Sequence, residues 1–204
     1  MKNRDFRLFD ISKLPIMTDN LAKELVSTIG NRLYDDQKQK LTFKLKMIDR
    51  FGSKCAYCGA ELDISSNEQI DHFYPIDESN RNSPNNLLLT CFLCNNAKRK
   101  NVFSKEAYPY SESYSRGFKR DKFGCIVPAD SNNTALISLA EKLRFSSISR
   151  TVTYAYLLID YLFDLLEKKS YDINNQLISS LAIFKTKLVE CSKSLYLKEQ
   201  IDNL

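Results

Sequence analysis

Two pairs of cysteines constrain this chain more than any other feature. Cys55 and Cys58 form the first pair, Cys91 and Cys94 the second, and each pair has the spacing Cys-x-x-Cys. Four thiolates arranged in two such pairs are common ligands of one tetrahedral Zn²⁺. The segment 59–90 between the pairs is longer than in a simple zinc ribbon. The sequence therefore predicts one structural zinc site that encloses an inserted segment, with buried free thiols as the alternative.

The inserted segment combines an Asp-His pair with two strand-like runs. Asp71 and His72 are neighbours, and His72 is the only histidine of the chain. The run 68–75 is short, holds branched and aromatic residues and ends at a proline, which favours a strand. The run 87–90 predicts a second strand or extended segment, and a helix is expected to open directly after Cys94. The predicted order is strand, loop, strand, helix.

Two helices are expected before the first cysteine pair, from about 18 to 29 and from about 36 to 51. Lysines at positions 40 and 44 interrupt the apolar side of the second helix. The residues expected to form that apolar side are Leu41, Leu45 and Ile48.

The chain after the second cysteine pair divides into a basic loop and a helical region. Residues 101–130 are expected to be loop-like, and helices are expected from about 151 to 168 and from about 172 onward. The apolar stripe 154–166 is interpreted as ordinary core, with a docking surface as the alternative. We therefore expect three parts: a helical lead-in over 1–50, a metal-binding core over 51–105, and the basic loop with the helical region over 106–204.

Positive charge is concentrated in one window. The chain carries a net charge of +5, and residues 98–122 hold eight Lys or Arg and three Asp or Glu, which accounts for the whole excess. Such an asymmetry favours a polyanionic partner, with a solvated loop as the alternative. Three tyrosines in this window are interpreted as packing residues, with base stacking as the alternative: Tyr108, Tyr110 and Tyr114.

Several function classes are disfavoured. Neither a GxxxxGK[ST] nor a GxGxxG phosphate loop occurs, so nucleotide binding by this chain is not expected. No apolar leader follows the first residues. The most hydrophobic run, 154–166, contains two aspartates and is too short to cross a bilayer. The sequence predicts a cytoplasmic protein without a membrane partner.

The segment from about 50 to 103 resembles the HNH endonuclease family. The features that carry the resemblance are the two cysteine pairs, the Asp-His pair at 71 and 72, Asn86, and the motif Cys-Asn-x-x-Lys at 94–98. The resemblance implies an α+β fold, mostly α-helical. In it a small zinc-bound ββα-metal core would be flanked by N-terminal helices and a C-terminal helical region.

The family pattern implies a role for each matching residue. His72 would be the general base that deprotonates the attacking water, and Asp71 would be a ligand of a catalytic Mg²⁺ or Mn²⁺. Asn95 would be the second protein ligand of that ion, and Asn86 would brace the loop and orient the His72 ring. Neighbours on a strand point to opposite sides, so a twist or bulge is expected where Asp71 and His72 meet.

The sequence departs from the family pattern in two places. The loop 77–81 lacks the glycine pair of many members, which would alter the fit to the DNA minor groove. Asn95 stands where many members carry a histidine, which would weaken metal affinity. Lys98 matches the terminal lysine of the family and is expected to contact phosphate. The other residues expected to contact nucleic acid are Arg99, Lys100, Lys119 and Arg120.

These inferences lead to a metal-dependent HNH endonuclease that hydrolyses DNA phosphodiester bonds. The layout also resembles the HNH subunit of Septu-type and retron-associated bacterial defence systems. This implies a role in anti-phage defence with an ATPase partner, while a restriction-type or homing-type nuclease is the alternative. A different class of function is a non-catalytic zinc module that binds nucleic acid or protein. A third is an interaction module built by residues 130–204.

Overall fold

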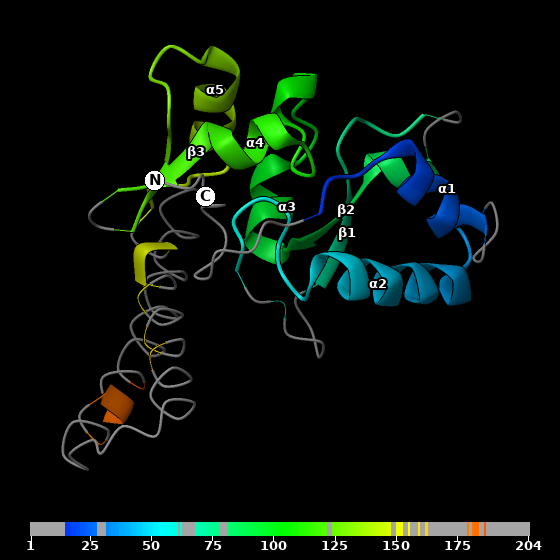
Figure 1. Cartoon of the computed structure of the whole chain (residues 1–204), viewed down its shortest axis with the longest axis horizontal. Coiled ribbons are helices and arrows are strands. Elements are labelled where there is room, and N and C mark those ends of the chain that lie inside the picture. Colours follow the sequence, from blue (N-terminus) through cyan, green and yellow to red (C-terminus); the bar gives the residue numbers. More distant parts are fainter. Residues whose placement is uncertain are drawn as a thin grey trace. The chain divides into compact units, whose positions relative to one another are not determined.

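The computed structural model describes most of the chain up to residue 152. The described ranges are 15–27, 32–60, 68–77, 81–121, 124–147 and 150–152, with isolated positions at 62, 155, 159, 162, 179, 181–183 and 186 (Figure 1). The chain divides into two compact units. The first comprises residues 1–119 and 127–144, and the second comprises 120–126 and 145–204.

A hairpin followed directly by a helix forms the centre of the first unit. Strand β1 (Glu68–His72) pairs with β2 (Leu87–Cys91) in antiparallel register, from Glu68 opposite Cys91 to His72 opposite Leu87. Helix α3 (Phe92–Lys98) follows β2 without a linker and contacts both strands. The predicted order of strand, loop, strand and helix is confirmed, and so is the α+β fold class.

The helix after the second strand begins three residues earlier than the sequence suggested. Cys91, the last residue of β2, is the N-cap of α3, so Cys94 already lies in the first helical turn. The prediction that the helix opens only after Cys94 is wrong. A helical turn places residues three apart on the same face, and this directs the two thiols of the pair to one side.

Two helices precede the hairpin, as predicted. The first, α1, spans Asp19–Ser27, and the hydroxyl oxygen of Thr18 accepts from the backbone N–H of Leu21 at 3.2 Å. The second, α2, spans Gln37–Phe51, and the Asp36 side chain caps it by accepting from the N–H of Gln39. In Figure 1, α2 runs alongside the hairpin, and it contacts β2.

The buried face of α2 differs from the predicted one. Its buried residues are Phe43, Met47 and Phe51, whereas Leu41 is 49% and Leu45 67% exposed. The prediction followed the aliphatic residues, but the aromatic rings and the methionine recur at the same four-residue spacing and bury larger side chains. With this face buried, one flank of α2 lies beside the hairpin. This flank carries Lys44, whose ammonium lies 3.0 Å from the Glu68 carboxylate of β1.

Residues 101–130 are more regular than the predicted loop. They form the helix α4 (Glu112–Gly117), a 3₁₀ turn at Lys105–Ala107 and the paired strands β3 (Phe118–Arg120) and β4 (Ile126–Pro128). The polar run before α5 (Thr134–Lys142) ends in an N-cap, Asn133, whose side chain accepts from the N–H of Leu136. The tyrosines in this part pack: Tyr114 and Tyr110 are buried, and the Tyr110 ring stacks on Phe51 with centroids 4.0 Å apart.

The predicted helices at 151–168 and from 172 onward lie mostly outside the described residues, and so does the apolar stripe 154–166. The three-part organisation at 1–50, 51–105 and 106–204 stays a prediction. Within the part of the chain that the structure describes, no helix combines the length and apolar character that a membrane span requires.

Candidate active site and metal centre

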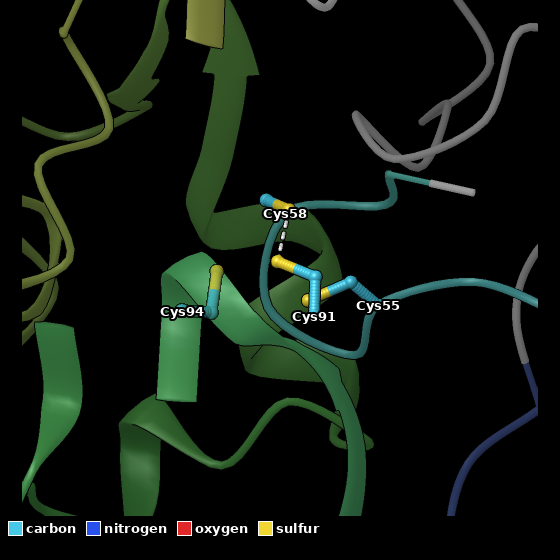
Figure 2. A group of neighbouring side chains, drawn as sticks. All are labelled: Cys55, Cys58, Cys91 and Cys94. Carbon is cyan, nitrogen blue, oxygen red and sulfur yellow. Dashed lines mark hydrogen bonds between the residues drawn. The ribbon is translucent and has the colours of Figure 1, made fainter. Parts of the chain in front are cut away.

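The four cysteines of the two pairs converge on one point. All are buried, and their sulfur atoms lie within 4.8 Å of one another (Figure 2). The Cys58 and Cys91 sulfurs are 3.8 Å apart. Four thiolates around Zn²⁺ with bonds of about 2.3 Å have sulfurs separated by about 3.8 Å. The cluster therefore has the size and donor set of a tetrahedral zinc site, and this part of the prediction is supported.

Backbone hydrogen bonds hold the first cysteine pair. Gly59 donates to the carbonyl of Cys55 at 2.9 Å, and Cys55 donates to the carbonyl of Ala60 at 2.8 Å. Gly59 has φ +75°, a conformation that glycine adopts without steric cost. The N–H of Ala56 donates to the carbonyl of Leu89 in β2 at 2.9 Å. This bond attaches the turn of the first pair to the strand that leads into the second.

Burial makes the sulfur cluster a poor place for free thiolates. Desolvation raises the pKa of the Cys55 thiol well above its ordinary value. Without a cation this thiol would stay protonated, and a bound metal ion reverses that preference because it stabilises the thiolate directly.

Asp71 is buried on β1, within hydrogen-bond reach of Tyr57 and of Lys98 of α3. It is 6% exposed, and its two carboxylate oxygens have different partners. Oδ2 accepts from the Tyr57 hydroxyl at 2.9 Å, and Oδ1 accepts from the Lys98 ammonium at 3.2 Å. Burial raises the pKa of Asp71, while the nearby Lys98 charge opposes that shift. Asp71 is thus a carboxylate held on both oxygens by protein donors.

Lys98 is the second buried charge of this group. Only 2% of the residue is exposed, and its ammonium also donates to the backbone carbonyl of His72 at 2.6 Å. The lysine of the Cys-Asn-x-x-Lys motif therefore points from α3 into the hairpin and toward Asp71. Its predicted phosphate contact stays a prediction, but the partners seen here are the carboxylate and the main chain of β1.

His72 is buried on the other side of β1. Its Nε2 lies 2.9 Å from the backbone carbonyl of Arg81, and its ring meets the Tyr34 ring edge to face with centroids 4.6 Å apart. Burial lowers the pKa of His72; the hydrogen bond to the Arg81 carbonyl opposes that shift, and the positive charges of Arg81, Lys98 and Lys40 add to it. The imidazole is therefore neutral near pH 7.

The loop and turn that enclose His72 are joined to each other. The Asn82 side chain accepts from the N–H of Tyr34 at 2.7 Å and donates to Asp35 at 3.0 Å. The Arg81 guanidinium forms an ion pair with Asp35. These contacts fix the loop whose carbonyl meets the imidazole.

Asn86 braces the chain directly after β1. Its side-chain oxygen accepts from the N–H of Tyr74 at 2.7 Å, and its amide donates to the carbonyl of Tyr74 at 3.2 Å. Its backbone carbonyl accepts from the N–H of Phe73 at 2.8 Å. These bonds match the bracing role expected of this residue. The ring of His72 is instead contacted by Arg81 and Tyr34.

Comparison with known proteins agrees with this arrangement. The family model described as HNH endonuclease matches residues 55–101, which include both cysteine pairs, the hairpin and α3. Residues 55–101 are thus similar to the HNH endonuclease domain. The match covers less than half of the chain, so it identifies the HNH segment and leaves the flanking regions unassigned.

Part of this chain is similar in sequence to a protein named for the Septu system. The Septu protein PtuB of Bacillus mycoides (strain KBAB4) is 34% identical over 88 residues. The alignment covers 36% of this chain and 28% of that protein. This chain thus spans less than a third of the length of the relative it matches. No solved structure matches.

Asp71 and His72 of the HNH segment do not converge. The pairing of β1 with β2 continues without a bulge to His72. Asp71 therefore contacts Tyr57 and Lys98, while His72 contacts the loop at Arg81. The predicted bulge within the paired strand is wrong, because each side chain finds its partners on its own side of the strand.

Asn95 lies on α3 and faces the start of β1. Its amide donates to the side-chain oxygen of Gln69 at 2.7 Å. Gln69 and Asp71 are two residues apart on β1, so their side chains lie on the same face of the strand. Asn95 and Asp71 thus lie along one side of the HNH hairpin, and no hydrogen bond joins them among the described residues.

The predicted nucleic-acid contacts occupy different environments. Arg99 and Lys100 are exposed at the end of α3, and Lys119 is exposed on β3. Arg120 belongs to the second unit, where its guanidinium donates to the carbonyl of Gly124 at 2.8 Å. Their contacts with nucleic acid stay predictions.

Sequence reasoning missed two residues that contact the site directly. Tyr57 stands between Cys55 and Cys58, a position expected to be buried. Since a buried tyrosine hydroxyl needs a hydrogen-bond partner, this position could have predicted a contact with a polar residue of the site. Tyr34 had no local signal, since it reaches His72 only through the fold.

Proposed function

We propose that this protein is a metal-dependent HNH endonuclease that hydrolyses phosphodiester bonds of DNA. The observation that carries the proposal is the state of His72. A neutral imidazole, fixed in one tautomer, lies on β1 of an HNH segment of ββα order. Such a group is suited to remove a proton from water near pH 7.

The tautomer of His72 follows from its partner. The carbonyl oxygen of Arg81 only accepts hydrogen bonds, so the Nε2 atom facing it at 2.9 Å carries the ring proton. In a neutral ring the other nitrogen, Nδ1, then has the free lone pair. Nδ1 is the atom that would act as the base in the proposed reaction.

The predicted ligands of the catalytic ion have the right donor chemistry. Asp71 offers carboxylate oxygens, each with a second lone pair, and the side-chain oxygen of Asn95 accepts no hydrogen bond from the described residues. Oxygen donors of this kind suit Mg²⁺ or Mn²⁺. When bound, such an ion would supply positive charge for the phosphoryl and leaving oxygens.

We propose a structural role for the zinc site. Zn²⁺ held by Cys55, Cys58, Cys91 and Cys94 would tie the turn before the hairpin to the first turn of α3. This keeps the strand that carries Asp71 and His72 between two fixed ends. Four cysteine thiolates would complete a tetrahedral ligand set, and such a site would have no position for a substrate water.

One observation favours a second candidate, a non-catalytic zinc module. Both carboxylate oxygens of Asp71 are engaged, and one of them by a buried ammonium that already compensates the negative charge. A site of this kind has less need of a divalent ion. The module would bind nucleic acid or protein without cutting.

A cleavage assay separates the two functions. The full chain is incubated with supercoiled plasmid DNA and Mg²⁺ or Mn²⁺, alone and with candidate partners. The nuclease proposal expects nicking by the wild type and its loss in His72→Ala, with the zinc content and folded signal of the wild type retained. DNA binding without nicking under every metal and partner condition would favour the non-catalytic module.

The similarity to the Septu protein PtuB supports a proposed role in anti-phage defence. We propose that the nuclease works with an ATPase partner in the bacterial cytoplasm, as the resemblance to Septu-type systems implies. Residues 106–204 are the proposed docking region. Co-purification with a candidate ATPase, and loss of the complex when residues 145–204 are removed, would test this assignment.

A further inference from the structure

We infer that Lys40 binds a backbone phosphate of the nucleic acid beside His72, a role that rests on the proposed nuclease function. Lys40 lies on α2, outside the matched HNH segment and outside the basic window 98–122. It would supply the cation that positions the substrate strand at the base.

One aromatic ring joins Lys40 to the proposed base. The Lys40 ammonium lies over the Tyr34 ring, 4.3 Å from its centroid. The imidazole of His72 meets the same ring at 4.6 Å, with the ring planes at 71°. The ammonium and the imidazole are therefore neighbours across a single tyrosine. The positive charge of Lys40 is also among the causes that lower the pKa of His72.

Lys40 is the uncompensated cation of this neighbourhood. Among the described residues the Lys40 ammonium forms no ion pair, and it lies over the face of the Tyr34 ring. The nearby cations Lys44 and Arg81 are both paired with carboxylates. Lys44, one helical turn along, pairs with Glu68 at 3.0 Å, and Arg81, 5.7 Å from the same ring, pairs with Asp35.

The chemistry of the missing partner follows from this imbalance. An ammonium held against an aromatic face keeps its donors available, and it suits an anion that approaches from solvent. A phosphodiester is such an anion, and a single lysine recognises its charge without reading the base sequence. Because His72 must act on a phosphodiester, a phosphate of the same strand would come within reach of Lys40.

The sequence pattern agrees with a functional reason for this lysine. Lys40 and Lys44 interrupt the apolar side of α2, and both lie on the flank that the structure turns toward the hairpin and the Tyr34 turn. Lys44 has a structural partner in β1. Lys40 packs against the Tyr34 ring, and its positive charge is not paired with a carboxylate among the described residues. A lysine with a purely structural role would not need an unpaired charge.

The test compares Lys40→Ala with Lys38→Ala in the full chain. Lys38 lies two residues away on the exposed, opposite side of α2, so the control removes the same charge from the same helix. Binding to a labelled DNA duplex is measured by fluorescence anisotropy over a range of salt concentrations, without added Mg²⁺ or Mn²⁺. Zinc content and thermal unfolding confirm that each variant is folded.

The inference expects weaker binding by Lys40→Ala and a salt dependence, log K against log salt, that is shallower by about 1. Lys38→Ala should stay close to the wild type, and Lys40→Arg should restore most of the binding. Equal effects of Lys40→Ala and Lys38→Ala, or a wild type that binds no DNA, would overturn the inference. A wild type that binds but never cleaves would instead refute the nuclease function and leave the binding comparison intact.

Discussion

The Tyr57 hydroxyl donates to the Asp71 carboxylate at 2.9 Å, and Tyr57 itself stands between Cys55 and Cys58. The backbone carbonyl of Tyr57 accepts from the Tyr114 hydroxyl at 2.7 Å. A single residue thus connects the sulfur cluster, the carboxylate of β1 and helix α4. The turn of the first cysteine pair is thereby hydrogen-bonded directly to Asp71.

Removing the Tyr57 hydroxyl should destabilise the protein without displacing the metal. Tyr57→Phe leaves a buried carboxylate oxygen without this donor, which costs about 1–3 kcal/mol. The free energy of unfolding in urea measures the loss, and metal analysis should show zinc at the wild-type level. Tyr108→Phe is the matched control, because the buried Tyr108 hydroxyl has no hydrogen-bond partner among the described residues. Equal stability losses in the two variants would contradict the role assigned to Tyr57.

The buried pair of Asp71 and Lys98 should show strong coupling. Lys98→Met leaves the Asp71 charge without its cation in the interior, and loss of one partner of a buried pair costs about 3–5 kcal/mol. Combining Lys98→Met with Asp71→Asn should recover part of that loss, since the uncompensated charge is gone. Urea unfolding of the two single variants and the double variant gives the coupling energy. Additive losses would mean that the two residues do not act as a pair.

His72 should titrate below the usual range for histidine. Burial lowers its folded-state pKa, so between that value and the unfolded value near 6.5 the unfolded chain binds more protons. The stability contributed by neutral His72 is therefore complete above pH 6.5 and declines as the pH falls through this window. His72 is the only histidine, so a single imidazole resonance in the NMR spectrum reports its titration without assignment.

The stability profile of His72→Gln supplies the comparison for that measurement. Asp71 has a raised pKa and acts with the opposite sign, but it is present in both proteins. The difference between the two pH profiles should thus isolate the histidine. A wild-type resonance that titrates above 6.5 would show that the ring is not desolvated as described.

Zinc should depend on the four clustered cysteines and not on Cys125. Cys94→Ser removes one thiolate from the tetrahedral set, and the protein should lose zinc and unfold more readily. Cys125→Ser should keep one zinc per chain, because Cys125 instead lies 3.2 Å from the Thr151 hydroxyl. Elemental analysis and the absorption spectrum of the Co²⁺-substituted protein measure both. Zinc retained in Cys94→Ser would contradict the assigned ligand set.

The parts of the fold that the sequence predicted are those encoded by local spacing. The order of β1, β2 and α3 followed from a short branched run, an apolar run and the second cysteine pair. The starts of the two helices before the hairpin, expected at about 18 and about 36, also followed from local patterns. The convergence of the sulfur atoms followed from ligand spacing, because one tetrahedral ion brings together two pairs that lie far apart in sequence.

The parts that the sequence did not predict depend on contacts between distant segments. The burial of Phe43 and Met47 in place of Leu41 was decided by what packs against α2, which periodicity alone does not specify. The surroundings of His72 come from a turn at Tyr34 and a loop at Arg81, and neither carries a motif. The inward direction of Lys98 was missed because a lysine at the end of a helix is usually solvated.

The acceptor that fixes the His72 ring is a main-chain carbonyl, and this has a consequence for how the site tolerates change. Any residue at position 81 presents such an oxygen, so the acceptor itself does not depend on the side chain, whereas its position is supported by the ion pair of Arg81 with Asp35. Insertions or deletions in the loop would move that oxygen and so change the hydrogen bond of the His72 ring. The length of this loop should therefore matter more for the surroundings of His72 than the identity of the side chain at position 81.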